Sequence, residues 1–202
     1  MSVNLPGHSA PQEQRHQKKM RRAIALGCWR TVKILILLAM VRPTAAAQSA
    51  SEYQVKAAFL YNFAKFVEWP PSGFRDATAP LQICILGRDP FGQGLRDLVS
   101  TKTVNGRKLE IDYIVDAQLA RACHILFIAS SERARLKQIL ESMQGTIALT
   151  VGDMEGFAEQ GGMINFLLDN DRVLFEVNRN AAERAGLKIS SKLLSVAKAV
   201  IG

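Results

Sequence analysis

The sequence contains few of the residues from which catalytic and metal sites are built. It has three cysteines and three histidines in 202 residues, and His124 is the only histidine after residue 47. No His or Cys cluster has metal-ligand spacing, and neither a Ser-His-Asp nor a Cys-His arrangement can be assembled without His124. Residues 87–94 match neither the Walker pattern nor G-x-G-x-x-G. We therefore expect no enzyme, no metal and no cofactor, and interpret His124 as a structural residue and residues 87–94 as a turn.

Long hydrophobic runs are also absent. The apolar run at residues 34–41 is far shorter than the roughly 20 residues needed to cross a bilayer. It follows a basic stretch and precedes Pro43 and an Ala-x-Ala site, which are the parts of a secretory signal. We expect residues 1–47 to be a signal peptide cleaved after Ala47. The alternatives are an uncleaved amino-terminal anchor and a true start at Met20.

The excess of positive charge belongs to this segment. The whole chain has a formal net charge of +8, but residues 48–202 hold 18 basic and 17 acidic side chains. This balance gives no support to a nucleic-acid partner, despite a pI near 9.7. We expect one domain over residues 48–202, soluble outside the cytoplasm.

Only two cysteines lie outside the expected signal peptide. Cys84 and Cys123 are each near the start of an apolar, strand-like run. An even pair in an oxidising compartment favours a disulfide. The alternative is two buried thiols that act as small hydrophobic residues.

Helical and strand-like patterns alternate after residue 48. Ser49 and Glu52 form a capping box for a helix that Pro70 and Pro71 end at Trp69. Strands are expected at residues 81–86, 108–115, 124–129 and 147–151 and in a hairpin of 163–168 with 173–177, and helices at 89–100, 131–143, 178–186 and 189–201. This order predicts an α/β domain with a mixed, mostly parallel sheet flanked by helices on both faces. The strand at 124–129 is expected in the centre, because it is apolar on both faces.

Two segments have the composition of a partner-binding surface. The first carries more aromatic residues than one helical stripe needs, namely Tyr61, Phe63, Phe66 and Trp69. Its alternative is a helix buried between two layers. The second is Gly161, Gly162 and Met163, where paired glycines permit close approach. Its alternative is a loop-to-strand bend.

A third candidate site is a small-ligand rim. Glu176 lies near the carboxyl end of an expected strand, where α/β sheets bind ligands. Asn178 should cap the next helix, and Arg184 lies near that helix's end. A carboxylate and a guanidinium together could hold a zwitterion or a partner's charged pair. The alternative is an exposed salt bridge that contributes little.

The chain resembles the YfiR family over nearly the whole length that follows the signal. The matching segments, in order, are residues 53–70, 84–92, 123–128, 149–153 with Phe157, 161–166, 175–178 and 185–190. The resemblance implies a periplasmic α/β regulator, often dimeric, that binds the sensor domain of an inner-membrane diguanylate cyclase.

The resemblance also has implications for individual residues. Glu176 and Arg184 would hold a small ligand such as an amino acid, and Cys84 and Cys123 would form a family disulfide. Some relatives have a second cysteine pair where this chain has Ala158 and Asn165, so redox control by a second bridge is not implied here.

We therefore expect a repressor of cyclic-di-GMP signalling and biofilm formation that is released by a further envelope protein, such as an outer-membrane lipoprotein. The alternatives are a periplasmic small-molecule binding protein for a transporter or chemosensory receptor and, with less support, an envelope enzyme.

Overall fold

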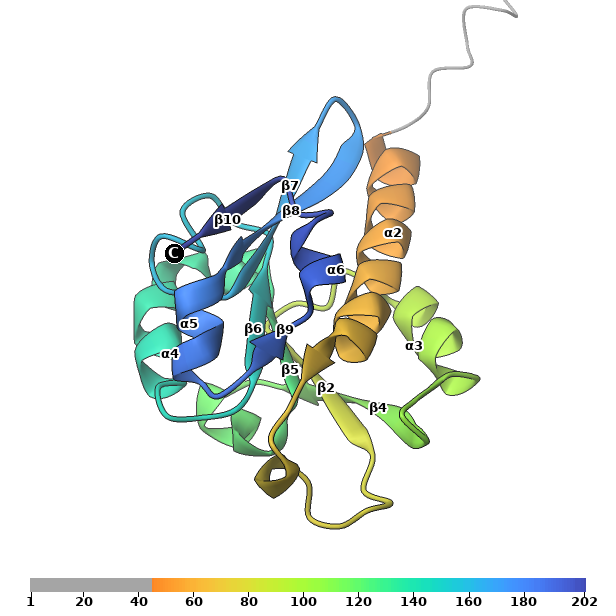
Figure 1. Ribbon diagram of the computed structural model, residues 1–202. Helices are drawn as coiled ribbons and strands as arrows, with labels where there is room; N and C mark the ends of the chain where they lie inside the picture. Colours follow the sequence, from red (N-terminus) through yellow and green to blue (C-terminus); the bar gives the residue numbers. More distant parts are fainter. Residues whose placement is uncertain (1–44) are drawn as a thin grey trace, which may run out of the picture. The chain divides into compact units, whose positions relative to one another are not determined.

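The apolar segments form one eight-stranded sheet in the computed structural model, which describes residues 45–202 (Figure 1). The strand order is β10-β8-β7-β6-β5-β2-β4-β3. Only the β7–β8 and β3–β4 pairs of this sheet are antiparallel. The strands are β2 (Leu81–Leu86), β3 (Thr103–Val104), β4 (Arg107–Ile114), β5 (Ile125–Ile128), β6 (Leu149–Gly152), β7 (Ile164–Asp169), β8 (Arg172–Asn178) and β10 (Ala199–Ile201). The predicted mixed, mostly parallel sheet is confirmed.

Strand β5 lies inside the sheet between β6 and β2, as its sequence predicted. All four of its side chains are fully buried, because helices cover both faces of the sheet. Ile125 and Phe127 belong to one core cluster and Leu126 and Ile128 to the other. A strand buried on both faces has no polar face, which explains its continuous apolar sequence.

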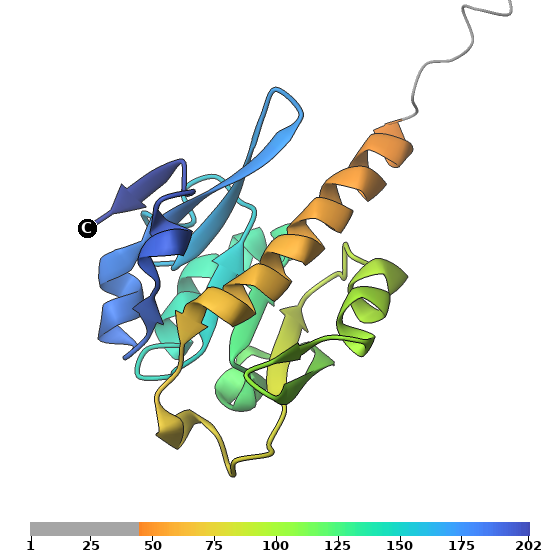
Figure 2. The same cartoon turned by 45° about the vertical axis from the view of Figure 1, so that its right-hand side comes forward.

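The two faces are covered by different helices (Figures 1 and 2). The first core cluster includes residues of α2, α3, α5 and α6, and the second is covered by α4 and the 3-10 helix η2. The helices are α2 (Ala45–Phe66), α3 (Gln93–Ser100), α4 (Leu136–Ser142), α5 (Arg179–Arg184) and α6 (Ser191–Leu194), with 3-10 turns η1 (Pro71–Gly73), η2 (Ala117–Ala122) and η3 (Ser130–Arg135). Among the described residues no helix meets the length and apolarity needed to span a membrane.

Helix α2 differs from its prediction at both ends. Ser49 lies inside the helix, so it is not the N-cap. The helix ends at Phe66 because the next two residues form β1 (Val67–Glu68), which pairs with β9 (Lys188–Ile189). The backbone hydrogen bonds of this small sheet replace those of a continued helix.

The predicted carboxyl-terminal helix over residues 189–201 is wrong. Ser190 caps the one-turn helix α6, its Oγ accepting a hydrogen bond from Leu193 N at 3.3 Å. The chain then forms β10, which pairs in parallel with β8. The backbone groups on the edge of β8 are thereby satisfied, and no local pattern in the sequence encodes that partner.

Ser131 does not cap the next helix either. Its Oγ accepts a hydrogen bond from Arg88 N at 2.9 Å, which fastens the turn after β2 to η3. The α-helix begins five residues later, at Leu136.

The disulfide between Cys84 and Cys123 is confirmed. The two Cα atoms are 5.8 Å apart, and both residues are buried in the second core cluster. The bridge joins β2 to the turn that leads into β5, so it fastens two neighbouring strands at the centre of the sheet.

Candidate functional site

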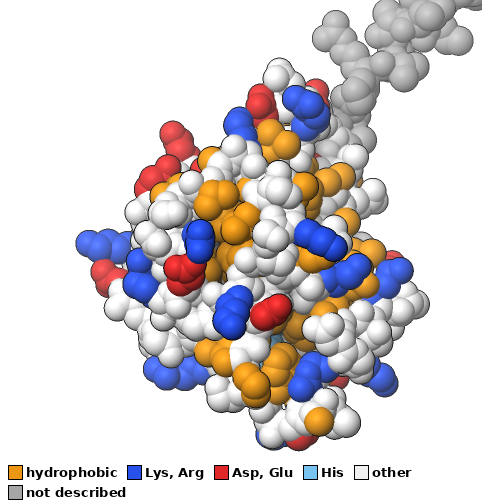
Figure 3. Space-filling model, in the orientation of Figure 1, with side chains coloured by type: hydrophobic (Ala, Val, Ile, Leu, Met, Phe, Trp, Pro, Cys, Tyr) orange, Lys and Arg blue, Asp and Glu red, His pale blue; other side chains and the backbone are white. Residues whose placement is uncertain are grey.

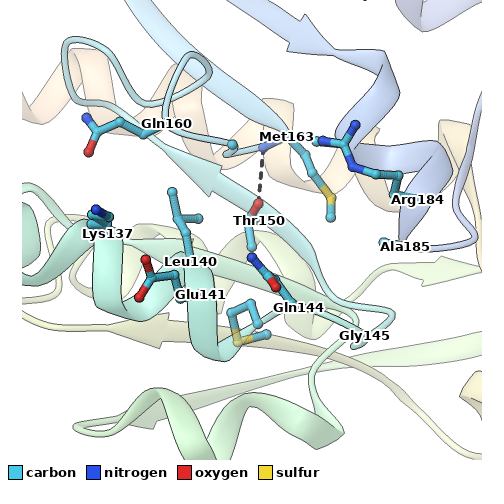
Figure 4. A pocket seen from close by; sticks show the side chains of 13 residues that line it. Lys137, Leu140, Glu141, Gln144, Gly145, Thr150, Gln160, Met163, Arg184 and Ala185 are labelled. Carbon is cyan, nitrogen blue, oxygen red and sulfur yellow. Dashed lines mark hydrogen bonds between the residues drawn. The ribbon is translucent and has the colours of Figure 1, made fainter.

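A cavity of about 560 Å³ lies between α4 and α5, beside the starts of β6 and β7 (Figure 4). It brings together three residues that the sequence had assigned to two separate sites, namely Gly161, Met163 and Arg184. Leu140 and Met143 of α4 supply further apolar surface. Its volume is within the range of small-molecule sites.

The strands hold Met163 in place at this cavity. Its backbone N donates to Thr150 Oγ1 at 3.1 Å, and its carbonyl accepts from Asn178 N at 2.7 Å. Gly161, two residues earlier, has a φ of +104°, in the region that favours glycine. The glycine therefore sets the turn that places Met163 between β6 and β8, as the loop-to-strand alternative proposed.

Charged and amide side chains surround the apolar part of the cavity. Lys137 and Glu141 project from α4, and Arg184 lies across from them on α5 (Figure 4). Within residues 48–202 Arg184 forms no salt bridge, so its guanidinium is available to a carboxylate. An apolar surface beside an available guanidinium suits an apolar group that carries a carboxylate.

Glu176 and Asn178 lie outside the lining of this cavity. Glu176 Oε1 accepts a hydrogen bond from Asn165 Nδ2 at 2.9 Å, and Asn165 Oδ1 accepts from Met154 N at 3.1 Å. Glu176 therefore supports the turn after β6, and no ion pair with Arg184 forms within the described chain. The predicted pairing of Glu176 with Arg184 at one rim is not what the structure shows.

Asn178 caps α5, as the sequence predicted. Its Oδ1 accepts a hydrogen bond from Ala181 N at 2.9 Å, and its Nδ2 donates to Ala158 O at 2.9 Å. Both ends of the amide are thus engaged in structure. A ligand-binding role for Asn178 or Glu176 stays a prediction.

Gly162 is buried against an aromatic ring, which leaves it no partner-facing surface. A Cβ at this position would lie 2.1 Å from Phe157 Cε1, and Phe157 is fully buried. The second glycine is therefore required by core packing, and its assignment to partner contact is corrected.

Replacing Gly162 by alanine should lower the free energy of unfolding by about 1–3 kcal/mol, because the Phe157 ring must move within a packed core. Chemical denaturation followed by circular dichroism measures the change. Gly94→Ala is the matched control, since a Cβ there meets nothing within 4 Å. Equal stability of Gly162→Ala and the unmodified protein would contradict the packing role.

The aromatic segment divides into core and partly exposed residues. Phe63 is fully buried, with Phe166 and Phe175 at ring-centroid distances of 5.6 and 5.2 Å. Its assignment to partner contact is therefore corrected in favour of the buried-helix alternative. Tyr61 and Phe66 are partly buried, and the Lys65 ammonium lies 5.5 and 5.6 Å from their ring centroids.

Trp69 lies beyond the helix and is also partly buried. Its Nε1 donates a hydrogen bond to His124 O at 3.1 Å. Trp69, Tyr61 and Phe66 are absent from the lining of the cavity. Partner contact by these three residues stays a prediction.

A buried ion pair under α2 was missed by the sequence reasoning. Lys56 Nζ lies 2.9 Å from Asp153 Oδ2 and 2.5 Å from Glu52 Oε1. Tyr53 Oη donates to Asp153 Oδ2 at 2.6 Å. A sequence signal was present, because Lys56 lies four residues after Glu52 and four residues before Leu60 and so shares a helical face with both.

This cluster lies where β6 ends, at the carboxyl edge of the sheet. Burial, and after it the hydrogen bond to the Asp153 carboxylate, raises the pKa of Tyr53 above its ordinary value. Asp153 Oδ1 is buried without a hydrogen-bond partner within the described chain. The cluster joins α2 to the sheet and is enclosed by aromatic rings, with Phe91 packed edge-on against Tyr53 at 5.5 Å.

Residues 53–198 match the model of the YfiR/HmsC-like family, which covers almost all of the described domain. The chain belongs to this family. It is a family of periplasmic regulatory proteins, and the buried disulfide agrees with an oxidising compartment. Residues 1–44 of the expected signal peptide lie outside the described residues.

Two solved structures are similar to parts of this chain. One is a conserved domain protein from Vibrio cholerae, with a TM-score of 0.50 and 10% identity over 73% of this chain and 60% of that one. The other is an ABC domain in complex with L-Trp from Streptococcus pneumoniae, with a TM-score of 0.47 and 11% identity over 60% of this chain and 55% of that one. The chain spans less than two thirds of either protein. The similarity to the first protein concerns the fold alone.

Within residues 48–202 no three His, Cys, Asp or Glu side chains are placed to hold a metal ion. Charges of both signs are scattered over the face shown in Figure 3, among patches of apolar side chains.

Proposed function

We propose that this protein is a periplasmic repressor of cyclic-di-GMP signalling that binds the sensor domain of an inner-membrane diguanylate cyclase. The observation that carries the proposal is the family match over residues 53–198. The repression, its partner and release by an outer-membrane lipoprotein rest on that membership, as does the formation of a homodimer.

Repression by binding requires a difference in affinity. The protein must bind the inactive state of the cyclase more tightly than the active state, since equal affinity shifts no equilibrium. The cavity between α4 and α5 is our candidate contact. Arg184 would pair with a carboxylate of the partner, and the surface at Met163 would take an adjacent apolar side chain.

Replacing Arg184 by glutamate should raise the dissociation constant for the cyclase sensor domain about 30-fold, since an interface arginine commonly contributes about 2 kcal/mol. Titration calorimetry with the purified sensor domain measures the change. Arg172→Glu is the matched control. It reverses the same charge at the turn of the β7–β8 hairpin, outside the lining of the cavity. Equal affinities for both variants and the unmodified protein would show that the cavity is not part of the interface.

The function itself is tested in the cell. Deleting the gene should raise cellular cyclic-di-GMP and biofilm, and an unchanged level under several growth conditions would contradict the proposal. A neighbouring gene that encodes transmembrane helices and a GGDEF-type domain would support it.

A second candidate function is small-molecule binding for a transporter or chemosensory receptor, which the cavity volume favours. Saturable binding of a free amino acid, together with neighbouring genes for a permease and an ATPase, would support this alternative.

A further inference from the structure

The buried imidazole of His124 is held at both ring nitrogens. Nδ1 lies 3.0 Å from Gln82 N, and Nε2 lies 3.1 Å from Gly73 O. A backbone N–H can only donate, so Nδ1 must present its lone pair. Nε2 then carries the ring proton and donates it to the Gly73 carbonyl. This geometry requires neutral His124.

The segment over residues 69–80 contacts the sheet in part through this ring. The Phe74 ring stacks on the imidazole, with the centroids 4.3 Å apart at 23°, and Trp69 meets it edge-on at 6.0 Å. Trp69 Nε1 also donates to His124 O. Two aromatic side chains thus pack against the imidazole, and His124 as a whole is only 4% exposed.

The positive charge near the His124 ring opposes a second proton on the imidazole. Arg107 of β4 lies over the Phe74 ring at 3.8 Å, and its Nη1 donates to Asp76 O and Ala79 O. Burial lowers the pKa of His124, and the Arg107 charge lowers it further, while the hydrogen bond to Gly73 acts in the opposite direction.

The acidic and basic side chains of residues 69–80 do not stabilise a charged His124 ring. Arg75 and Asp76 are exposed and pair with each other at 3.4 Å. The Asp76 carboxylate is further engaged by Thr78 N and Oγ1, each at 2.8 Å. No carboxylate within the described chain forms a salt bridge with His124.

We propose that His124 is an acid-sensitive latch on the segment over residues 69–80. A proton taken from solvent onto Nδ1 turns the acceptor into a donor that faces Gln82 N–H. Two donors then oppose each other in a buried site beside the Arg107 guanidinium, which is costly. The segment opens, the imidazolium reaches water, and Trp69 and Phe74 become exposed.

The direction of the pH dependence follows from the lowered pKa. The open state takes up a proton as the pH falls below about 6.5, whereas the closed state does not until the pH reaches its lower pKa. The closed latch is therefore fully stable above pH 6.5 and weakens as the pH falls. At a pH below both pKa values, the equilibrium constant for opening should exceed its value at neutral pH. The increase is about tenfold for each pH unit by which closure lowers the pKa of His124.

Hydrogen–deuterium exchange of the exported protein tests this directly. After correction for the intrinsic pH dependence of exchange, residues 69–80 should exchange faster at pH 5.0 than at pH 7.5, while β6 stays protected. The His124 ring can be followed in parallel by NMR, since it is the only histidine from residue 48 onward. Unchanged exchange across this range would overturn the latch.

Two variants separate the latch from a general loosening of the fold. In His124→Asn the amide oxygen can still accept from Gln82 N but does not titrate, so the pH dependence of exchange should vanish. In Phe74→Leu the titrating ring stays but loses its stacked partner, so the segment should exchange faster even at pH 7.5. Retention of the acid-induced exchange in His124→Asn would assign it to other groups and overturn the proposal. The latch can fail while cyclase binding holds, because neither experiment uses the cyclase.

Discussion

Replacing Lys56 by methionine should lower the free energy of unfolding by about 3–5 kcal/mol. The substitution leaves the Asp153 carboxylate buried without its cation, and an uncompensated buried charge is strongly destabilising. Lys56 and Asp153 are each about 5% exposed at the side chain, so water cannot take over the missing interaction. Chemical denaturation monitored by circular dichroism measures the loss.

Lys65→Met is the matched control, because Lys65 lies on the same helix but is exposed. It should change stability by less than about 0.5 kcal/mol. Combining Lys56→Met with Asp153→Leu should recover much of the loss, since it replaces a buried ion pair by an apolar contact. A stability loss in Lys56→Met no greater than that in Lys65→Met would show that the pair does not hold α2 to the sheet.

Removing the disulfide by Cys84→Ala and Cys123→Ala together should cost about 4 kcal/mol. The bridge spans a sequence separation of 39 residues, and closing a loop of this length removes about that much conformational entropy from the unfolded chain. Thermal and denaturant unfolding of the double variant against the oxidised protein measure the cost. Alanine is the suitable replacement, because both sulfurs lie in the core.

Reductant provides the control for this prediction. A thiol reductant should destabilise the unmodified protein and leave the double variant unchanged, so the effect belongs to the bridge and not to lost packing. Two thiols that can be alkylated in the unfolded but unreduced protein would contradict the bridge itself.

The sequence predicted the sheet well where its strands are apolar on both faces. The segments at β2 and β5 have no competing helical pattern, and their neighbours alternate with helices in the order typical of a parallel sheet. The hairpin of β7 and β8 was also predictable, because Asn170 and Asp171 form a local turn with positive φ at both residues. The N-cap of α5 was predictable for the same reason, because Asn178 and Ala181, which form its hydrogen bond, are three residues apart.

The site was predictable only in part. Gly161, Met163 and Arg184 were each identified from local signals, but their meeting in one cavity depends on the pairing of β6 with β7 and of β7 with β8. Phe63 and Trp69 occur in one aromatic run, and only the packing of α2 on the sheet distinguishes the buried ring from the partly exposed one.

The sequence by itself determined the fold class and the central place of β5, because each depends on residue type and order along the chain, and it favoured the pairing of Cys84 with Cys123 without deciding it. Only the tertiary structure decided that residues 199–201 extend the sheet, that Lys56 is buried against Asp153 and that His124 holds residues 69–80. In each of these cases a polar group is satisfied by a partner distant in the sequence. The cost of burying a backbone amide, an ammonium or an imidazole without a partner is what selects that arrangement.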